Sequence, residues 1–180
     1  MSEGQCHGDN MMQLHTFCDA SLDAYAVVIF LHTENQSRQV SVQLVMAKSR
    51  LAPVKRPSIP RLELVACVIG ARLTHFVKES LDMPAVHSFL WSDSSTALSW
   101  IKRNDEWGTF VGNRVKEICS LTTPEDWRHV PGVKNPADLP SRGCSPAYLL
   151  EPRWWEGPYW LRFHPDVWPV EQFDLDEGAV

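Results

Sequence analysis

Several features that would point to other classes of protein are missing from this sequence. The five cysteines, at positions 6, 18, 67, 119 and 144, include no Cys-x-x-Cys pair, which argues against a zinc ribbon and a dithiol redox site. No apolar run approaches the roughly 20 residues that a membrane span requires. The first ten residues have neither a basic start nor an apolar stretch, so we expect no secretion signal. The sequence therefore predicts an intracellular protein without a membrane partner.

Basic residues are missing from the end of the chain and concentrated in one segment about a third of the way along it. From Asp166 onward there are five acidic residues and no Lys or Arg. Residues 48–61 show the opposite bias, with no acid and five basic residues: Lys48, Arg50, Lys55, Arg56 and Arg61. Taken alone, such a segment is most often a solvent-exposed loop, although it can also bind phosphate groups.

The pattern of apolar residues, which make up 44% of the chain, predicts an α/β domain. Three closely spaced β-rich runs, at 14–17, 24–31 and 40–47, indicate an antiparallel meander. The elements expected after them are a helix from Ser58 with a core stripe ending at Phe76, a strand at 86–91, helices at 94–101 and 109–121, a strand at 127–130, and a last helix running toward Leu150. The order βββαβααβα predicts a mixed five-stranded sheet with helices packed on it.

The domain boundaries follow from composition. Residues 1–12 are polar and irregular and are expected to be a flexible leader, and residues 13–150 form the predicted domain. Residues 151–180 form a Trp/Pro-rich extension with an acidic tail that we expect to be disordered. The extension contains Trp154, Trp155, Trp160 and Trp168, and such large aromatic side chains are expected to pack against the domain or a neighbour.

Four acidic residues stand where predicted elements begin or end: Asp19, Glu63, Asp93 and Asp138. Each alone has an ordinary explanation in turn chemistry or the helix dipole, as does Asp23 in a nearby turn. If the first strand and the 86–91 strand are neighbours, Asp19 and Asp93 lie side by side, and a helix crossing the sheet brings Glu63 to them. Carboxylates gathered in this way repel one another unless a cation neutralises them, and their oxygen atoms suit Mg²⁺. Two such ions about 4 Å apart can activate water and stabilise a leaving oxygen.

The short sequence motifs around these acids are individually weak but together indicate a particular family. The segments are Cys-Asp-Ala-Ser at 18–21, Arg-Leu-Glu-Leu at 61–64, Ser-Asp-Ser at 92–94 and Ala-Asp at 137–138. In their order, and in the secondary structure expected between them, they resemble the ribonuclease H type 1 superfamily. The segments 47–53, 59–64, 127–132, 135–138 and 154–158 further resemble the ribonuclease H-like domain of BEL/Pao-type LTR retrotransposon polyproteins, the Pao retrotransposon family. The resemblance covers roughly residues 14–165.

The resemblance implies a ribonuclease H-like fold and metal-dependent hydrolysis of the RNA strand of RNA–DNA hybrids. It implies that Asp19, Glu63, Asp93 and Asp138 are catalytic and hold two Mg²⁺ ions, with Mn²⁺ as a substitute. The nucleic-acid contacts that we expect are Lys48, Arg50, Lys55, Arg56, Arg61, Ser94 and Asn135. The implied partners are the reverse transcriptase and integrase regions of the same polyprotein, in a cytoplasmic virus-like particle or in the nucleus.

Two departures from the family pattern predict weak activity in isolation. The loop at 132–135 lacks the histidine that many cellular relatives carry before the last catalytic acid, and His129 on the preceding strand is expected to be structural. An extended basic protrusion between the middle helices is also missing, because Lys102 and Arg103 are soon followed by Asp105 and Glu106.

Two other functions remain open at this point. The first is a catalytically silent or co-opted nucleic-acid-binding module with the same fold. The second is an integrase- or transposase-like nuclease that would use Asp19, Asp93 and a later acid such as Glu125, although Glu125 follows Pro124 in a predicted loop. The sequence is equally compatible with a polyprotein fragment, a degraded copy and a co-opted standalone gene.

Overall fold

The computed structural model describes residues 11–55, 57–103, 105–150 and 152–169. Most of the expected leader, Arg56 and the acidic tail from residue 170 therefore lie outside the described residues. The strands are β1 (Met11–Ala20), β2 (Ala24–Glu34), β3 (Val40–Leu51), β4 (His87–Ser92) and β5 (Trp127–His129). The helices are α1 (Ile59–Ser80), α2 (Ser95–Lys102), α3 (Thr109–Leu121), α4 (Asp138–Arg142), α5 (Pro146–Leu149) and α6 (Pro152–Glu156).

The five strands form one mixed sheet in the order β3-β2-β1-β4-β5. β1, β2 and β3 are an antiparallel meander, and β4 and β5 are parallel to β1. Residues 26–30 of β2 are all buried because both faces of the sheet are covered, which explains their uninterrupted apolar sequence. The predicted order of elements and the mixed sheet are confirmed.

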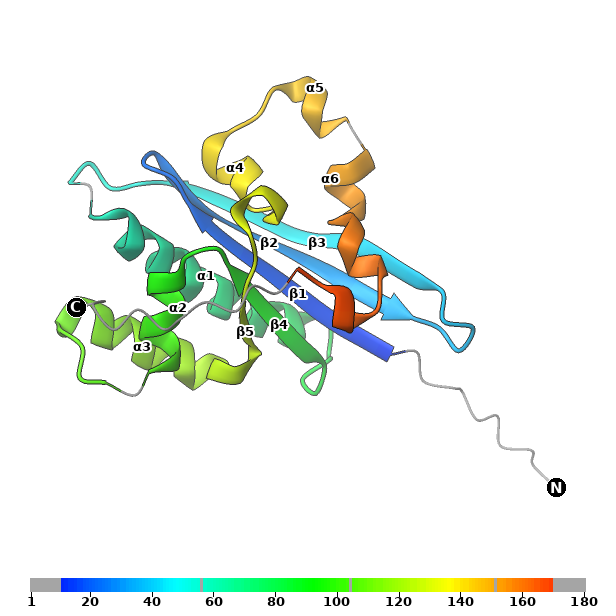
Figure 1. Cartoon of the computed structure of the whole chain (residues 1–180), viewed down its shortest axis with the longest axis horizontal. Helices are drawn as coiled ribbons and strands as arrows, with labels where there is room; N and C mark the ends of the chain where they lie inside the picture. Colours follow the sequence, from blue (N-terminus) through cyan, green and yellow to red (C-terminus); the bar gives the residue numbers. More distant parts are fainter. Residues whose placement is uncertain (1–10, 56, 104, 151, 170–180) are drawn as a thin grey trace.

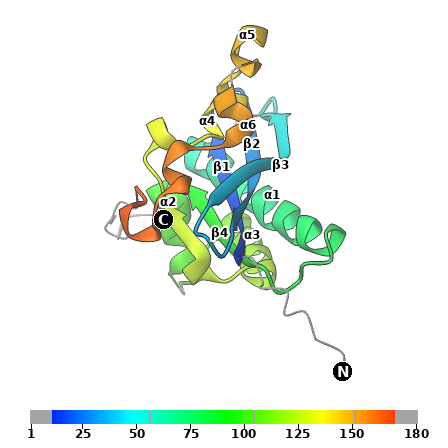
Figure 2. The ribbon, with the colours of Figure 1, turned by 90° about the vertical axis from the view of Figure 1, so that its right-hand side faces the viewer.

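Helices and irregular segments cover opposite faces of this sheet (Figures 1 and 2). On one face, α1, α2 and α3 contribute to a core with Leu14, Ile29 and Leu90. On the other face, a second core surrounds Phe17, Phe30 and Trp91, and its remaining cover comes from the end of the chain. The carboxyl ends of β1 and β4 meet between these two layers.

The second core depends on residues 152–169, which we call the C-terminal segment. Leu161 is completely buried in it, and Trp168 is 5% exposed. The expectation that the aromatics of this segment pack against the domain is confirmed for Trp154, Trp160 and Trp168, whereas Trp155 is 55% exposed. In the structure the C-terminal segment completes the hydrophobic core rather than extending from a finished domain.

Several local expectations were wrong. The last helix ends at Arg142, because Gly143 adopts a positive φ of 84° and Pro146 then starts the separate short helix α5. The side chain of Phe76, expected in the core stripe of α1, is 53% exposed, and Val77 is buried instead. Met11 and Met12, assigned to the leader, are the first residues of β1.

No helix among the described residues is long and apolar enough to cross a membrane.

Candidate active site

Three of the four predicted acids converge at the carboxyl ends of two neighbouring strands. Asp19 is the second-to-last residue of β1, and Asp93 follows β4 directly. The parallel register pairs Cys18 with Ser92, so Asp19 and Asp93 are neighbours across the sheet. Glu63 reaches them from α1, and one ligand oxygen from each of the three acids lies within 4.8 Å of the others. We call Asp19, Glu63 and Asp93 the carboxylate cluster.

Glu63 is placed by the position at which α1 starts. The helix begins at Ile59, so Glu63 is its fifth residue and lies in the second turn. Its residue is 6% exposed, and Leu62 and Leu64 on either side are fully buried. The packing of these neighbours fixes the helix against the sheet and points the Glu63 side chain at the cluster.

Three residues between positions 129 and 141 hold Asp19 and Asp93 in place. The side-chain amide of Asn135 donates a hydrogen bond of 3.0 Å to the Cys18 carbonyl and one of 3.4 Å to Asp93 Oδ1. The His129 ring donates from Nε2 to the Asp93 carbonyl at 3.1 Å, which agrees with the structural role expected for this histidine. The Ser141 hydroxyl, on α4, donates to Asp19 Oδ2. These positioning contacts cross between segments that are far apart in the sequence.

Gly132 allows the loop before α4 to approach the cluster. A Cβ atom at this position would lie 2.8 Å from Asp93 Oδ2, closer than such atoms can come without movement. Any larger residue would therefore displace the Asp93 carboxylate or the loop. The sequence shows Gly132 only as part of a Pro-Gly turn, and nothing in it indicates the tight contact with Asp93, which lies 39 positions earlier in the chain.

Asp138 lies beside the cluster but is not part of it. It is the first residue of α4, and its Oδ1 accepts a hydrogen bond from Arg142 one helical turn later. Its negative charge contributes to the raised pKa values of Asp19 and Asp93, so it is close enough to act on both. The structure thus places the fourth acid nearby, with its carboxylate engaged by a cation from its own helix.

The electrostatics of the cluster are those of unneutralised, desolvated carboxylates. Burial and the neighbouring Asp19 and Asp93 raise the pKa of Glu63 to about 10. Burial, with the charges of Asp93 and Asp138, raises the pKa of Asp19 to about 6 despite the hydrogen bond from Ser141. The pKa of Asp93 is also raised, chiefly by burial. A cation bound at the cluster would reverse these shifts.

The cluster has the donor set that a hard divalent cation requires. Glu63 Oε2 is buried and has no hydrogen-bond partner among the described residues, which is costly for a polar oxygen unless a ligand binds it. All three convergent groups offer carboxylate oxygen atoms, the ligands that Mg²⁺ prefers. Asp19, Glu63 and Asp93 therefore fit a divalent metal ion, with Asp138 within reach as a further ligand.

The structure leaves four of the predicted nucleic-acid contacts exposed, whereas Ser94 and Asn135 make hydrogen bonds within the protein. Lys48, Arg50, Lys55 and Arg61 are exposed. Ser94 caps α2 by accepting a hydrogen bond of 3.2 Å from the Ala97 backbone. The Asn135 residue is 5% exposed, and its side chain is engaged by Cys18, Asp93 and Ala137, so its role here is positioning.

The exposed basic residues lie at the same end of the sheet as the cluster. The register aligns Asp19 with Ala26 on β2 and Ser49 on the edge strand β3. Lys48 and Arg50 flank Ser49, about 10 Å from Asp19 at the usual strand spacing. Arg61 lies farther along, over the Phe110 ring at 5.2 Å. The basic segment therefore borders the cluster across the edge of the sheet.

A mixed sheet with acids gathered at the ends of its first and fourth strands defines a ribonuclease H-like domain. The family model of the Pao retrotransposon-like RNaseH-like domain matches residues 4–94, more than half of the chain. The chain belongs to this family, and it is therefore an RNase H-like domain of the nuclease kind. The match includes Asp19, Glu63 and Asp93 and ends before Asp138.

Comparison with solved structures found ribonuclease H domains. The N-terminal RNase H domain of Rv2228c from Mycobacterium tuberculosis is 11% identical, with 69% of this chain and 86% of that chain covered and a TM-score of 0.46. RNase H1 from Halobacterium salinarum is 12% identical, with 70% and 89% covered and a TM-score of 0.42. LC11-RNase H1, isolated from compost and solved in complex with RNA/DNA hybrid, is 12% identical, with 71% and 91% covered and a TM-score of 0.46. A comparison with curated proteins found no match.

The raised pKa values predict that the metal-free protein loses stability as pH rises. Between the ordinary value of 4.5 and about 10, Glu63 keeps its proton in the folded state and loses it in the unfolded state. Asp19 behaves in the same way between 3.8 and about 6. Because the folded state binds more protons in these windows, each group lowers the free energy of unfolding by up to about 1.4 kcal/mol per pH unit as pH rises.

Thermal melts in EDTA between pH 5 and 8 measure this effect. Glu63→Gln removes the main titrating group, so its melting temperature should rise relative to wild type as pH increases. Mg²⁺ or Mn²⁺ should stabilise wild type by mass action, and Asp93→Asn should weaken that stabilisation. A difference between wild type and Glu63→Gln that stays constant with pH would contradict the assigned protonation of the cluster.

Proposed function

We propose that this domain hydrolyses the RNA strand of RNA–DNA hybrids in a divalent-metal-dependent reaction. The observation that carries the proposal is the convergence of Asp19, Glu63 and Asp93 within 4.8 Å, with a buried Glu63 oxygen that lacks a partner among the described residues. A bound cation would allow all three carboxyl groups to be ionised together at neutral pH. Membership of the RNase H-like family supports the choice of substrate.

The residues of the chain have separate tasks in this proposal. Asp19 stands in β1 and Asp93 directly follows the neighbouring strand β4, so their carboxylates are fixed by the sheet and by the hydrogen bonds from Ser141 and Asn135. Glu63 completes the donor set from α1. Asp138 can exchange its contact with Arg142 for the metal or for a water molecule. When bound, Mg²⁺ supplies the charge that activates water and stabilises the leaving oxygen.

An integrase-like arrangement is not supported by the placement of its third acid. Glu125 lies in the 3₁₀ turn Pro124–Asp126, is exposed, and is not a member of the carboxylate cluster. Glu63 takes that place instead. The geometry therefore favours the set that the ribonuclease H resemblance implies.

Cleavage of defined duplexes tests the substrate. With Mg²⁺, a labelled RNA–DNA hybrid should be cut in its RNA strand, because the 2′-OH distinguishes RNA from DNA at the site. Single-stranded RNA and duplex DNA of the same sequence should remain intact. Cutting of duplex DNA at a comparable rate would support an integrase-like nuclease, and no cutting with hybrid binding retained would support a silent binding module.

The basic segment is expected to contact the phosphate backbone of the hybrid. Replacing Lys48 and Arg50 together with Gln should weaken hybrid binding and reduce the slope of log affinity against log salt by about two. The matched control replaces two other exposed basic residues with Gln. They are Arg38, in the turn between β2 and β3, and Lys116, on α3. Equal changes in both double variants would mean that only net charge matters and not this segment.

A further inference from the structure

A cavity of about 840 Å³ opens beside the candidate active site. One wall is the loop from Gly132 to Leu139, which leads into α4, and the other is formed by α5 and the C-terminal segment. Asn135 and Asp138 belong both to this cavity and to the surroundings of the carboxylate cluster. The cavity therefore lies next to the place where the substrate would be cut.

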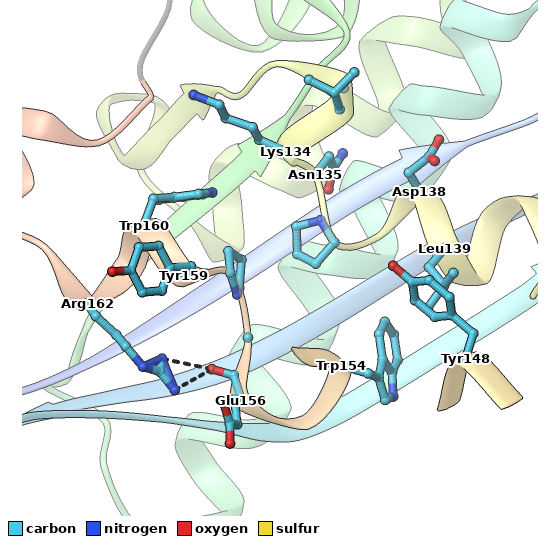
Figure 3. A pocket seen from close by; sticks show the side chains of 15 residues that line it. Lys134, Asn135, Asp138, Leu139, Tyr148, Trp154, Glu156, Tyr159, Trp160 and Arg162 are labelled. Carbon is cyan, nitrogen blue, oxygen red and sulfur yellow. Dashed lines mark hydrogen bonds between the residues drawn. The ribbon is translucent and has the colours of Figure 1, made fainter. Parts of the chain in front are cut away.

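The lining combines aromatic rings with cations (Figure 3). Tyr148 is 44% exposed and Tyr159 is 73% exposed, so both rings are accessible to a ligand. Lys134 is exposed on the loop wall, and Arg162 stands on the opposite wall, where its guanidinium donates two hydrogen bonds to the Glu156 carbonyl at 3.0 and 3.1 Å. These bonds fix the Arg162 cation at the rim.

This chemistry matches unpaired nucleotides better than other ligands. Bases stack on accessible aromatic rings, and Lys and Arg bind the phosphates between them. The volume falls within the range of about 300–1,000 Å³ typical of small-ligand sites, which suits one or two nucleotides and excludes a duplex. The acids of the lining do not oppose this, because Asp138 is paired with Arg142 and Glu156 is exposed to solvent.

We propose that this cavity binds unpaired nucleotides that continue one strand of the substrate beyond the hybrid. Tyr148 and Tyr159 stack on the bases, and Lys134 and Arg162 hold the phosphates. The inference rests on the proposed function, since it takes the nucleic acid at the carboxylate cluster as its starting point. It gives the C-terminal segment a role in binding substrate as well as in packing.

Binding of hybrids with and without a single-stranded overhang tests the cavity. Fluorescence anisotropy in EDTA, where cleavage does not interfere, would compare a blunt hybrid with hybrids that carry four unpaired nucleotides on either strand and at either end. At least one overhang should increase the affinity of wild type by about tenfold, equivalent to about 1.4 kcal/mol. Tyr159→Ala should lose most of this gain while its affinity for the blunt hybrid stays unchanged.

Three further variants separate stacking from a general loss of structure. Tyr159→Phe keeps the ring and should behave like wild type. Lys134→Gln should reduce the slope of log affinity against log salt for overhang binding by about one. Phe76→Ala removes an aromatic ring of similar exposure from α1 and should keep the full gain. An absent overhang gain in wild type, or an equal loss in Tyr159→Ala and Phe76→Ala, would overturn the proposal. Because no cleavage is measured, the result is independent of whether the hybrid is cut.

Discussion

Asp19→Asn and Asp93→Asn should each abolish cleavage of the RNA strand. Asp19 stands in β1 and Asp93 directly follows the neighbouring strand β4, so the sheet keeps the backbone from moving to restore a lost ligand. Removing one preorganised electrostatic group commonly costs about 10²–10³ in rate. Loss of a carboxylate that would hold the metal would also remove the activation of water. We expect a loss of at least about 10³-fold, which corresponds to roughly 4 kcal/mol of barrier. Folding should remain intact, because each substitution relieves repulsion between buried carboxylates.

Two other aspartates provide the graded comparison. Asp138→Asn should retain measurable activity, and more with Mn²⁺, because Asp138 lies outside the three-residue cluster and is engaged by Arg142. Asp23→Asn should match wild type, because Asp23 is exposed in the turn after β1. Single-turnover cleavage rates, with circular dichroism as the folding control, measure all four variants. An inactive Asp23→Asn beside an active Asp19→Asn would refute the assignment of the first-strand acid.

Trp168→Ala should strongly destabilise the domain although Trp168 is not part of the carboxylate cluster. The Trp168 ring packs against His15, Phe89 and Trp91 at centroid distances of 5.1, 5.4 and 5.9 Å. Its Nε1 donates to the Phe163 carbonyl at 2.9 Å. Truncating a buried Trp costs about 3–5 kcal/mol, which for a domain of this size lowers the melting temperature by roughly 6–20 °C.

Trp155→Ala is the matched control within the same segment. Trp155 is 55% exposed and donates to the Leu149 carbonyl at 2.9 Å, so its loss should cost no more than about 1 kcal/mol. Urea unfolding of the two variants gives the comparison directly. Similar small losses of unfolding free energy in both variants would mean that the C-terminal segment is not part of the cooperative core. The predicted domain ending at residue 150 would then be stable without that segment.

A fragment without the C-terminal segment should be prone to aggregation. A fragment ending at residue 150 would expose the face of the sheet that Leu161 and Trp168 cover. The apolar side chains left open there include Phe17, Phe30 and Trp91. An exposed apolar area of this kind promotes aggregation. Any activity measurement should therefore use the full chain.

The order of the elements and the three members of the carboxylate cluster could be read from the sequence. Strand and helix patterns depend on the local spacing of apolar residues, and the continuous apolar run of β2 is a clear example. Asp19, Glu63 and Asp93 each follow or join such an element, so the topology alone brings them together. The basic residues near the cluster were likewise visible as a charge bias, although only the register of β3 shows where they lie.

What surrounds the cluster was decided by the tertiary structure. Ser141 contacts Asp19, Gly132 contacts Asp93, and Asp138 pairs with Arg142 instead of joining the other acids. The first two contacts join residues far apart in the chain, and no local propensity encodes them. The break of the last helix at Gly143 and the burial of Trp168 follow from how the end of the chain packs on the open sheet face. Local sequence therefore determined the elements and their acids, while packing between distant segments determined how those acids are held and what lies beside them.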